Sequence, residues 1–138
     1  MKHSRRIERR RWFIDEDLLG LGLTLERAGI DVVYPGHPSF PGTPRRTSDE
    51  DWIKIAGQNG WPAFTHDNRI LREKSTAGLL RNSPTVVFFL LGRDESIWHY
   101  VRMVAKHWDV VAAKLKDAER GDKRHHTINL RRVAAVQV

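Results

Sequence analysis

Short apolar runs recur along the chain and alternate with segments in which apolar residues are spaced as in a helix. Runs of this length, bounded by polar residues, predict buried strands. Residues 85–91 form the clearest run and predict a central strand that is covered on both faces. Pro62 lies inside another run and suits the start or the edge of a strand. The predicted strands span residues 12–14, 30–34, 61–65 and 85–91.

Helical spacing fills most of the intervals between these strands. Apolar residues recur every three or four positions in the first such segment, and Gly29 closes it as a helix C-cap. The longest apolar stripe begins at Ile97 and ends at Leu115, which predicts one long helix. Residues 119–126 are interpreted as a polar linker and residues 133–138 as an edge strand. The predicted helices span residues 18–28, 48–59, 68–81 and 97–115.

Residues 35–46 interrupt this alternation with four prolines and two glycines. Proline fixes its own backbone angle and donates no hydrogen bond, so this composition excludes regular structure. Loops of about a dozen residues in a compact domain are usually functional or mobile.

Strands that alternate with helices predict an α/β fold. The expected architecture has three layers, with a mostly parallel central sheet and helices on both of its faces. A chain of 138 residues is close to the modal domain size. We therefore expect a single domain over residues 12–138, preceded by a basic leader over residues 1–11.

The charge balance narrows the class of partner. The chain has 24 Lys and Arg against 17 Asp and Glu, a net charge of +7, which favours a polyanion such as nucleic acid. The leader holds six basic residues and one acidic residue, so most of the excess positive charge lies there. The absence of cysteine excludes disulfides, thiolate zinc sites and a cysteine nucleophile.

No apolar run approaches the roughly 20 residues that a transmembrane helix needs. No apolar stretch of signal-peptide length follows the basic leader either. The sequence therefore predicts a cytoplasmic protein with no membrane partner.

Acidic residues follow the predicted strands at three places. Each acid alone is explained as a helix cap, and Thr47 with Glu50 fits a capping box. In a parallel sheet, however, the strand ends that lead into helices lie on one edge, so Asp15, Asp49 and Asp67 are expected to converge. Crowded carboxylates repel one another, which either raises their pKa values or requires a cation to neutralise them, and all-oxygen ligands favour Mg²⁺ or Mn²⁺.

These acids stand in a pattern that resembles PIN-domain proteins, the metal-dependent ribonuclease fold that VapC-type toxins of toxin–antitoxin pairs use. The resemblance covers residues 12–91, with a long helix following in the expected order. The residues that carry it are Phe13, Ile14 and Asp15 at the first strand, then Asp49, Trp52, Ile53, Ala56, Gly60, Thr65 and Asp67.

The resemblance implies that Asp15, Asp49 and Asp67 bind the metal and that the Thr65 hydroxyl positions the site. For Thr65, a strand residue with a local backbone bond is an equal alternative. Two departures from the family pattern concern the metal. Residues 32–48 lack the usual glutamate, and Asn68 and Arg69 stand where many members have a further acid. The candidates to replace the missing acid are Asp17, Glu50 and Asp51.

Basic and aromatic residues near these acids are weaker candidates. Exposed basic side chains are most often simple solvating charge, and tryptophans in apolar positions are most often core. His66 is adjacent to Asp67 and within reach of a substrate, whereas the other histidines lack zinc-ligand spacing. The candidate phosphate contacts are Arg45, Arg46, Arg69, Arg72 and Lys74, and the candidate stacking residues are Trp52, Trp61, Trp98 and Trp108.

The function expected from these features is a Mg²⁺-dependent endoribonuclease that cuts structured RNA with metal-activated water. The resemblance further implies a toxin that forms a homodimer and a hetero-oligomer with a cognate antitoxin protein.

Three alternatives stay open. A receiver-like phosphoacceptor domain also has acids after its first and third strands, but Leu91 and Gly92 stand where it needs Ser or Thr. Residues 13–17 suggest an aspartyl-nucleophile phosphatase, for which a buried lysine partner is missing. The third alternative is a non-catalytic RNA-binding or partner-binding module whose acids serve only as caps.

The uneven charge distribution generates a first prediction. Deleting residues 1–10 is expected to make the salt dependence of RNA binding shallower while metal-dependent cleavage is kept, because phosphate contacts set the salt slope. Filter binding at several salt concentrations measures the slope. An unchanged slope would assign the phosphate contacts to the body of the protein.

Overall fold

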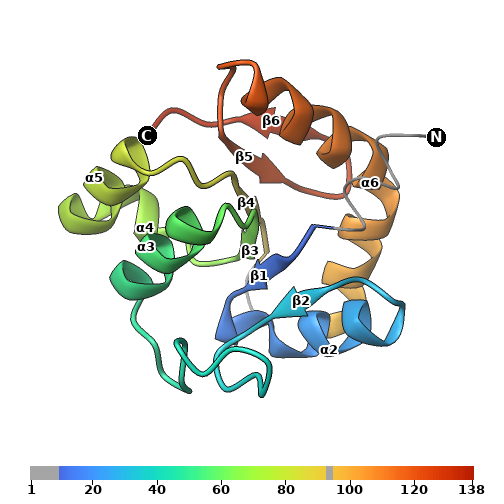
Figure 1. Ribbon diagram of the computed structural model, residues 1–138. Helices are drawn as coiled ribbons and strands as arrows, with labels where there is room; N and C mark the ends of the chain where they lie inside the picture. Colours follow the sequence, from blue (N-terminus) through green and yellow to red (C-terminus); the bar gives the residue numbers. More distant parts are fainter. Residues whose placement is uncertain (1–9, 93–94) are drawn as a thin grey trace.

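The computed structural model describes residues 10–92 and 95–138, which form one six-stranded sheet with helices on both faces (Figure 1). The strand order is β2-β1-β3-β4-β5-β6. All neighbouring strands are parallel except β5 and β6. The predicted α/β class is therefore confirmed. The strands are β1 (Trp12–Ile14), β2 (Val32–Val33), β3 (Ala63–Thr65), β4 (Val87–Leu90), β5 (His125–Ile128) and β6 (Val133–Ala135).

Two apolar cores lie on opposite faces of the sheet because successive strand residues point to opposite sides. Phe88 and Leu90 pack in one core and Val87 and Phe89 in the other, all four fully buried. Strand β4 is thus covered on both faces, as predicted. The helices α2 (Leu19–Arg27) and α6 (Ile97–Glu119) cover the first face, and α3 (Asp49–Asn59), α4 (Arg69–Arg72) and α5 (Lys74–Asn82) cover the second.

Helix α3 begins one residue later than the predicted capping box requires. The Ser48 hydroxyl accepts a hydrogen bond from the backbone N–H of Asp51 at 3.1 Å, whereas the Thr47 hydroxyl donates to the carbonyl of Pro44. Ser48 is therefore the N-cap, and the pairing of Thr47 with Glu50 was wrong. The helix ends as predicted at Gly60, whose φ of 70° is a left-handed conformation that glycine adopts without strain.

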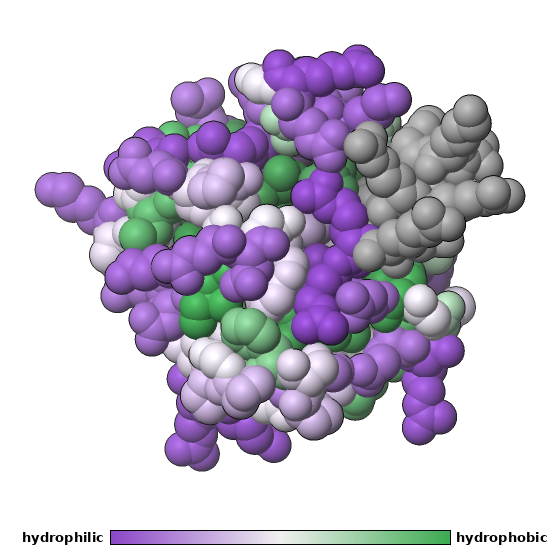
Figure 2. Space-filling view, in the orientation of Figure 1, coloured by the Kyte–Doolittle hydropathy of each residue, from purple (hydrophilic) through white to green (hydrophobic). Residues whose placement is uncertain are grey.

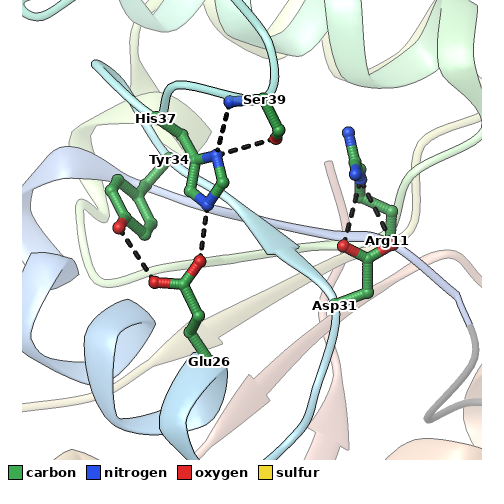
Figure 3. Close-up of polar contacts among 6 residues, drawn as sticks. All are labelled: Arg11, Glu26, Asp31, Tyr34, His37 and Ser39. Atoms are coloured by element: carbon green, nitrogen blue, oxygen red, sulfur yellow. Dashed lines mark hydrogen bonds and ion pairs between the residues drawn. The ribbon is translucent and has the colours of Figure 1, made fainter.

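Side-chain hydrogen bonds anchor the predicted proline-rich loop to α2. The carboxylate of Glu26 accepts from the Tyr34 hydroxyl at 3.1 Å and pairs with Nε2 of His37 at 2.6 Å (Figure 3). The backbone N–H of Ser39 donates to Nδ1 of the same imidazole at 3.0 Å. Beside the loop, Arg11 donates to both carboxylate oxygens of Asp31.

The linker predicted over residues 119–126 is shorter in the structure, where residues 120–124 connect two elements. Helix α6 continues to Glu119, and His125 and His126 form the first half of β5. Two histidines and a threonine lack the apolar signal of a strand, yet both histidines are buried between β4 and β6. The His126 ring stacks on Phe88, with ring centroids 5.4 Å apart.

Other boundaries also differ from the predictions. The predicted helix over 68–81 is two helices separated at Glu73, whose backbone is extended. The helix predicted from Leu18 is preceded by a 3-10 turn, η1 (Glu16–Leu18). The predicted strand over 30–34 contributes only Val32 and Val33 to the sheet.

Two large apolar side chains at the beginning of α6 are exposed to solvent. Trp98 is 66 % exposed and so keeps the accessibility that a candidate stacking residue needs, and Ile97, where the predicted apolar stripe begins, is 42 % exposed. Trp12 and Trp52 are fully buried.

Figure 2 shows mostly hydrophilic residues on the face in view. Within residues 10–92 and 95–138, no helix combines the length and the apolar character needed to cross a bilayer.

Most of the predicted leader, residues 1–9, lies outside the described residues. Arg10 is described, and its guanidinium donates to the Glu119 carboxylate at 2.7 Å and to the Gly60 carbonyl at 3.2 Å. A truncation that removes leader charge without breaking these contacts therefore ends at Arg9.

The buried His125 generates a second prediction. Burial lowers its pKa from 6.5 to about 4. The unfolded chain therefore takes up a proton near pH 6.5, and His125 stabilises the fold above that pH but loses this contribution as the pH falls toward 4. His125→Leu is expected to reduce the loss of unfolding free energy between pH 7 and pH 4.5 by about 2 kcal/mol.

Urea unfolding of both proteins at a series of pH values measures this effect. Parallel stability curves for wild type and His125→Leu would contradict a neutral, buried His125.

Candidate metal centre

The structure brings the predicted acids together at the edge where β1 and β3 end. Asp15 directly follows β1, and Asp67 lies two residues after β3. Asp49 is the first residue of α3. The charges of Asp49 and Asp17 act on Asp15, and those of Asp67 and Asp17 act on Asp49. The parallel topology places these acids within electrostatic range of one another.

The Thr65 hydroxyl connects two of the acids. It donates to Oδ2 of Asp15 at 2.7 Å and accepts from the backbone N–H of Asp67 at 3.2 Å. Both Thr65 and Asp15 are buried. The hydroxyl therefore orients the Asp15 carboxyl and also holds the turn that carries Asp67.

Burial raises the pKa of Asp15 from 3.8 to about 7. The hydrogen bond from Thr65 opposes this shift, and repulsion from Asp49 and Asp17 adds to it. Asp15 is only 7 % exposed, so water compensates little of its charge. A bound cation would supply the missing compensation.

Asp49 is oriented by its own helix. The indole Nε1 of Trp52 donates to Oδ1 of Asp49 at 2.9 Å, and Trp52 is fully buried in the core. Burial raises the pKa of Asp49, and this hydrogen bond opposes the shift. The role of Trp52 was missed, although its position three residues after Asp49 places both side chains on one helix face.

The Asp67 carboxylate forms an ion pair with Arg69 of the same chain. Nε of Arg69 donates to Oδ1 of Asp67 at 3.0 Å, and Nη2 donates to Oδ2 at 2.9 Å. This two-point contact holds the pKa of Asp67 below its usual value. Arg69 was predicted only as a phosphate contact, so its pairing with Asp67 is a second feature that the sequence reasoning missed.

The nearby acids have different positions. Asp17 lines the same hollow as Asp67 and repels both Asp15 and Asp49. Glu50 accepts a hydrogen bond from Ser75 and is thereby held toward α5, and Asp51 is exposed. Glu16 accepts from the backbone N–H of Arg46 at 2.7 Å. Of the three candidates to replace the missing acid, the geometry favours Asp17.

A hollow of about 330 Å³ lies beside the acids and has mixed charge. The ring of His66 is packed edge-on against Tyr100, and His66 Nδ1 is buried without a hydrogen-bond partner among the described residues. Arg45 lies outside the hollow and approaches Glu16 at 3.8 Å. The hollow is lined by Asp17, His66, Asp67, Asn68, Arg69, Arg72 and Gly92.

The chemistry of the donors fits a hard divalent cation, although the side chains are not yet gathered around one point. Across residues 10–92 and 95–138, no three carboxylate or histidine side chains are close enough together to hold a metal ion. The donors are all carboxylate oxygens, the type that Mg²⁺ and Mn²⁺ prefer. The Arg69 guanidinium stands in for a cation at Asp67. A metal ion at Asp67 would therefore compete with Arg69 for this carboxylate.

The raised pKa of Asp15 generates a third prediction, for the protein in EDTA. The folded state resists ionisation of Asp15 until about pH 7, so this residue costs stability as the pH rises from about 4 to 7. Asp15→Asn is expected to raise the unfolding free energy at pH 8 by roughly 2 to 4 kcal/mol and to leave it nearly unchanged at pH 3.5.

The exposed Asp51 gives a matched control, since Asp51→Asn removes one charge nearby without removing a buried one. Denaturant unfolding at both pH values measures the effect. Equal gains in the two variants at pH 8 would contradict a burial cost specific to Asp15.

Comparison with known proteins identifies the family of this chain. Residues 11–92 match a protein family described as PIN like domain. These residues include β1 to β4 and all the acids of the candidate centre. No curated protein and no solved structure matches the chain. Because the family match spans more than half of the chain, the protein belongs to the PIN-like domain family.

Proposed function

We propose that this protein is a Mg²⁺-dependent endoribonuclease whose cation is held by Asp15, Asp49 and Asp67. The observation that carries the proposal is the buried Asp15 carboxyl, which is repelled by two neighbouring carboxylates at the edge of a parallel sheet. PIN-like domains are typically nucleases, and the net charge of +7 suits a polyanionic substrate.

The chain positions its own ligands in this proposal. Thr65 orients Asp15 and the turn of Asp67, and Trp52 orients Asp49. A bound divalent cation lowers the pKa of a coordinated water and neutralises charge on the phosphate. Asp17 is the fourth carboxylate, and it either completes the ligand set or accepts a proton from the attacking water.

The basic side chains at the hollow hold the substrate. Arg72 and Arg69 line it together with His66, and arginine binds phosphate through two parallel hydrogen bonds. Arg45 and Arg46 are exposed on the proline-rich loop next to Glu16 and extend the basic surface. We propose that single-stranded RNA crosses this edge of the sheet, with a loop of a structured RNA as the substrate.

The biological role that we propose is that of a toxin in a toxin–antitoxin pair in the cytoplasm. The support for this role is the resemblance of residues 12–91 to VapC-type toxins. A cognate antitoxin would cover the acidic edge, and the toxin would form a homodimer within the larger hetero-oligomer.

One observation favours the non-catalytic alternative. Asp67 already has an arginine partner, so the acids serve partly as caps and ion-pair partners in this structure. The receiver-like alternative has less support, because β5 is followed by Asn129 and not by the lysine that such a domain needs.

The fourth prediction tests the catalytic proposal. Protein freed of any antitoxin is incubated with Mg²⁺ or Mn²⁺ and a hairpin RNA that has a single-stranded loop. Asp15→Asn and Asp67→Asn are expected to lower the cleavage rate about a hundredfold or more, because each removes charge that holds the cation. Asp51→Asn should cut at nearly the wild-type rate, since Asp51 is exposed and takes no part in the centre.

A second substrate tests the attacking group. Hairpins with 2′-deoxy sugars at the cleaved positions should still be cut, because metal-activated water does not use the 2′-hydroxyl. No cleavage by wild-type protein with either metal would show the catalytic proposal to be wrong. RNA binding without a Mn²⁺-dependent rise in melting temperature would then favour the non-catalytic module.

A further inference from the structure

Arg69 covers both oxygens of the Asp67 carboxylate. Its backbone N–H and its Nε each donate to Oδ1 at 3.0 Å, and its Nη2 donates to Oδ2 at 2.9 Å. The Asp67 side chain is only 10 % exposed, whereas that of Arg69 is 70 % exposed. The guanidinium therefore lies on the solvent side of the carboxylate, where a cation from solution would arrive.

A divalent cation and this guanidinium compete for Asp67. The guanidinium nitrogens Nε and Nη2 each occupy one lone pair, on Oδ1 and Oδ2 of Asp67. The positive charge of the guanidinium repels a second cation from the lone pairs that remain. Asp67 is also one of the two acids whose charge acts on Asp49. As long as Arg69 holds Asp67, the carboxylates are not free to close around a metal.

The Arg69 side chain also has access to a second kind of binding partner. It lines the hollow with Arg72 and Asn68, and its stem is exposed, so the side chain is able to turn toward a phosphate without disturbing the core. Phosphate oxygens match the guanidinium fork as well as a carboxylate does. Only the Arg69 end of this pair is exposed, at 70 % against 10 % for Asp67, so a phosphate from solution reaches the guanidinium directly and can compete with Asp67 for it.

We propose that Arg69 is a positioning residue that occupies the cation position at Asp67 until RNA arrives, and that it then transfers to an RNA phosphate and frees Asp67 for the metal. This inference rests on the metal-dependent function proposed above and adds a coupling between two ligands. RNA binding raises the affinity for metal, and by thermodynamic reciprocity metal binding raises the affinity for RNA by the same factor.

The experiment measures Mn²⁺ affinity by titration followed with electron paramagnetic resonance. Wild type is compared with Arg69→Gln, and Arg72→Gln serves as the matched control because it removes the same charge from the same hollow. Each protein is titrated alone and with a hairpin RNA whose loop linkages carry a methylene group in place of the bridging 3′-oxygen, so that water cannot expel that oxygen, and a gel shows that the RNA stays intact. Arg69→Lys keeps the charge but not the two-point fork.

Without RNA, Arg69→Gln is expected to bind Mn²⁺ about three- to tenfold more tightly than wild type, with Arg72→Gln within about twofold and Arg69→Lys between the two. The hairpin should tighten Mn²⁺ binding by wild type by a similar factor and have much less effect on Arg69→Gln. Arg72→Gln should keep the coupling while binding RNA more weakly.

Two results would overturn the proposal in distinguishable ways. If wild type binds Mn²⁺ and Arg69→Gln binds it no more tightly than Arg72→Gln does, the role of Arg69 is wrong and the metal centre stands. If neither wild type nor any variant binds Mn²⁺, with or without RNA, the metal-dependent function is wrong and the role of Arg69 fails with it.

Discussion

The parallel pairing of β1 with β3 is the constraint on which the candidate centre depends. This pairing aligns Ile14 with Phe64, so the next residues, Asp15 and Thr65, meet where the two strands end. They are fifty residues apart in the chain. No local interaction brings them together, so the centre exists only when the sheet has formed. The fully buried Phe13 and Phe64 on its two faces therefore also hold the acids in place.

Burial makes the charges of the candidate centre unfavourable, and hydrogen bonds compensate for only part of this cost. Burial opposes the charge of Asp15 and Asp49, and each acid receives one hydrogen bond from a fixed side chain, Thr65 or Trp52. Only Asp67 has a full counter-charge, from Arg69. Natural sequences keep unfavourable electrostatics of this kind mainly where a ligand or a reaction relieves them. The imbalance between these acids is therefore the strongest physical reason to expect a bound cation.

The sequence predicted the elements that have strong local signals. The apolar run of β4, the stop at Gly60 and the convergence of acids after parallel strands all follow from periodicity and topology. Strand β5 was missed because its histidines are buried by their neighbours in the sheet and not by their own hydropathy. The exposure of Ile97, at the start of the predicted stripe, was not foreseen because apolar spacing does not show where a helix leaves the sheet.

The details of the centre were harder to predict than its location. Side-chain pairings such as that of Arg69 with Asp67 depend on rotamers, which composition and spacing do not specify. The choice of Asp17 over Glu50 and Asp51 likewise depends on which way each side chain points.

The proline-rich loop has a consequence for the rim of the centre. The backbone N–H of Arg46 binds Glu16, the residue between Asp15 and Asp17, while His37 at the other part of the loop binds Glu26. The short turn that bears two acids is thus tied to the sheet through Asp15 and to the loop through Glu16. The loop therefore stabilises this turn from outside the sheet. A change in the length of the loop would alter the orientation of the Asp17 side chain before it affected the core.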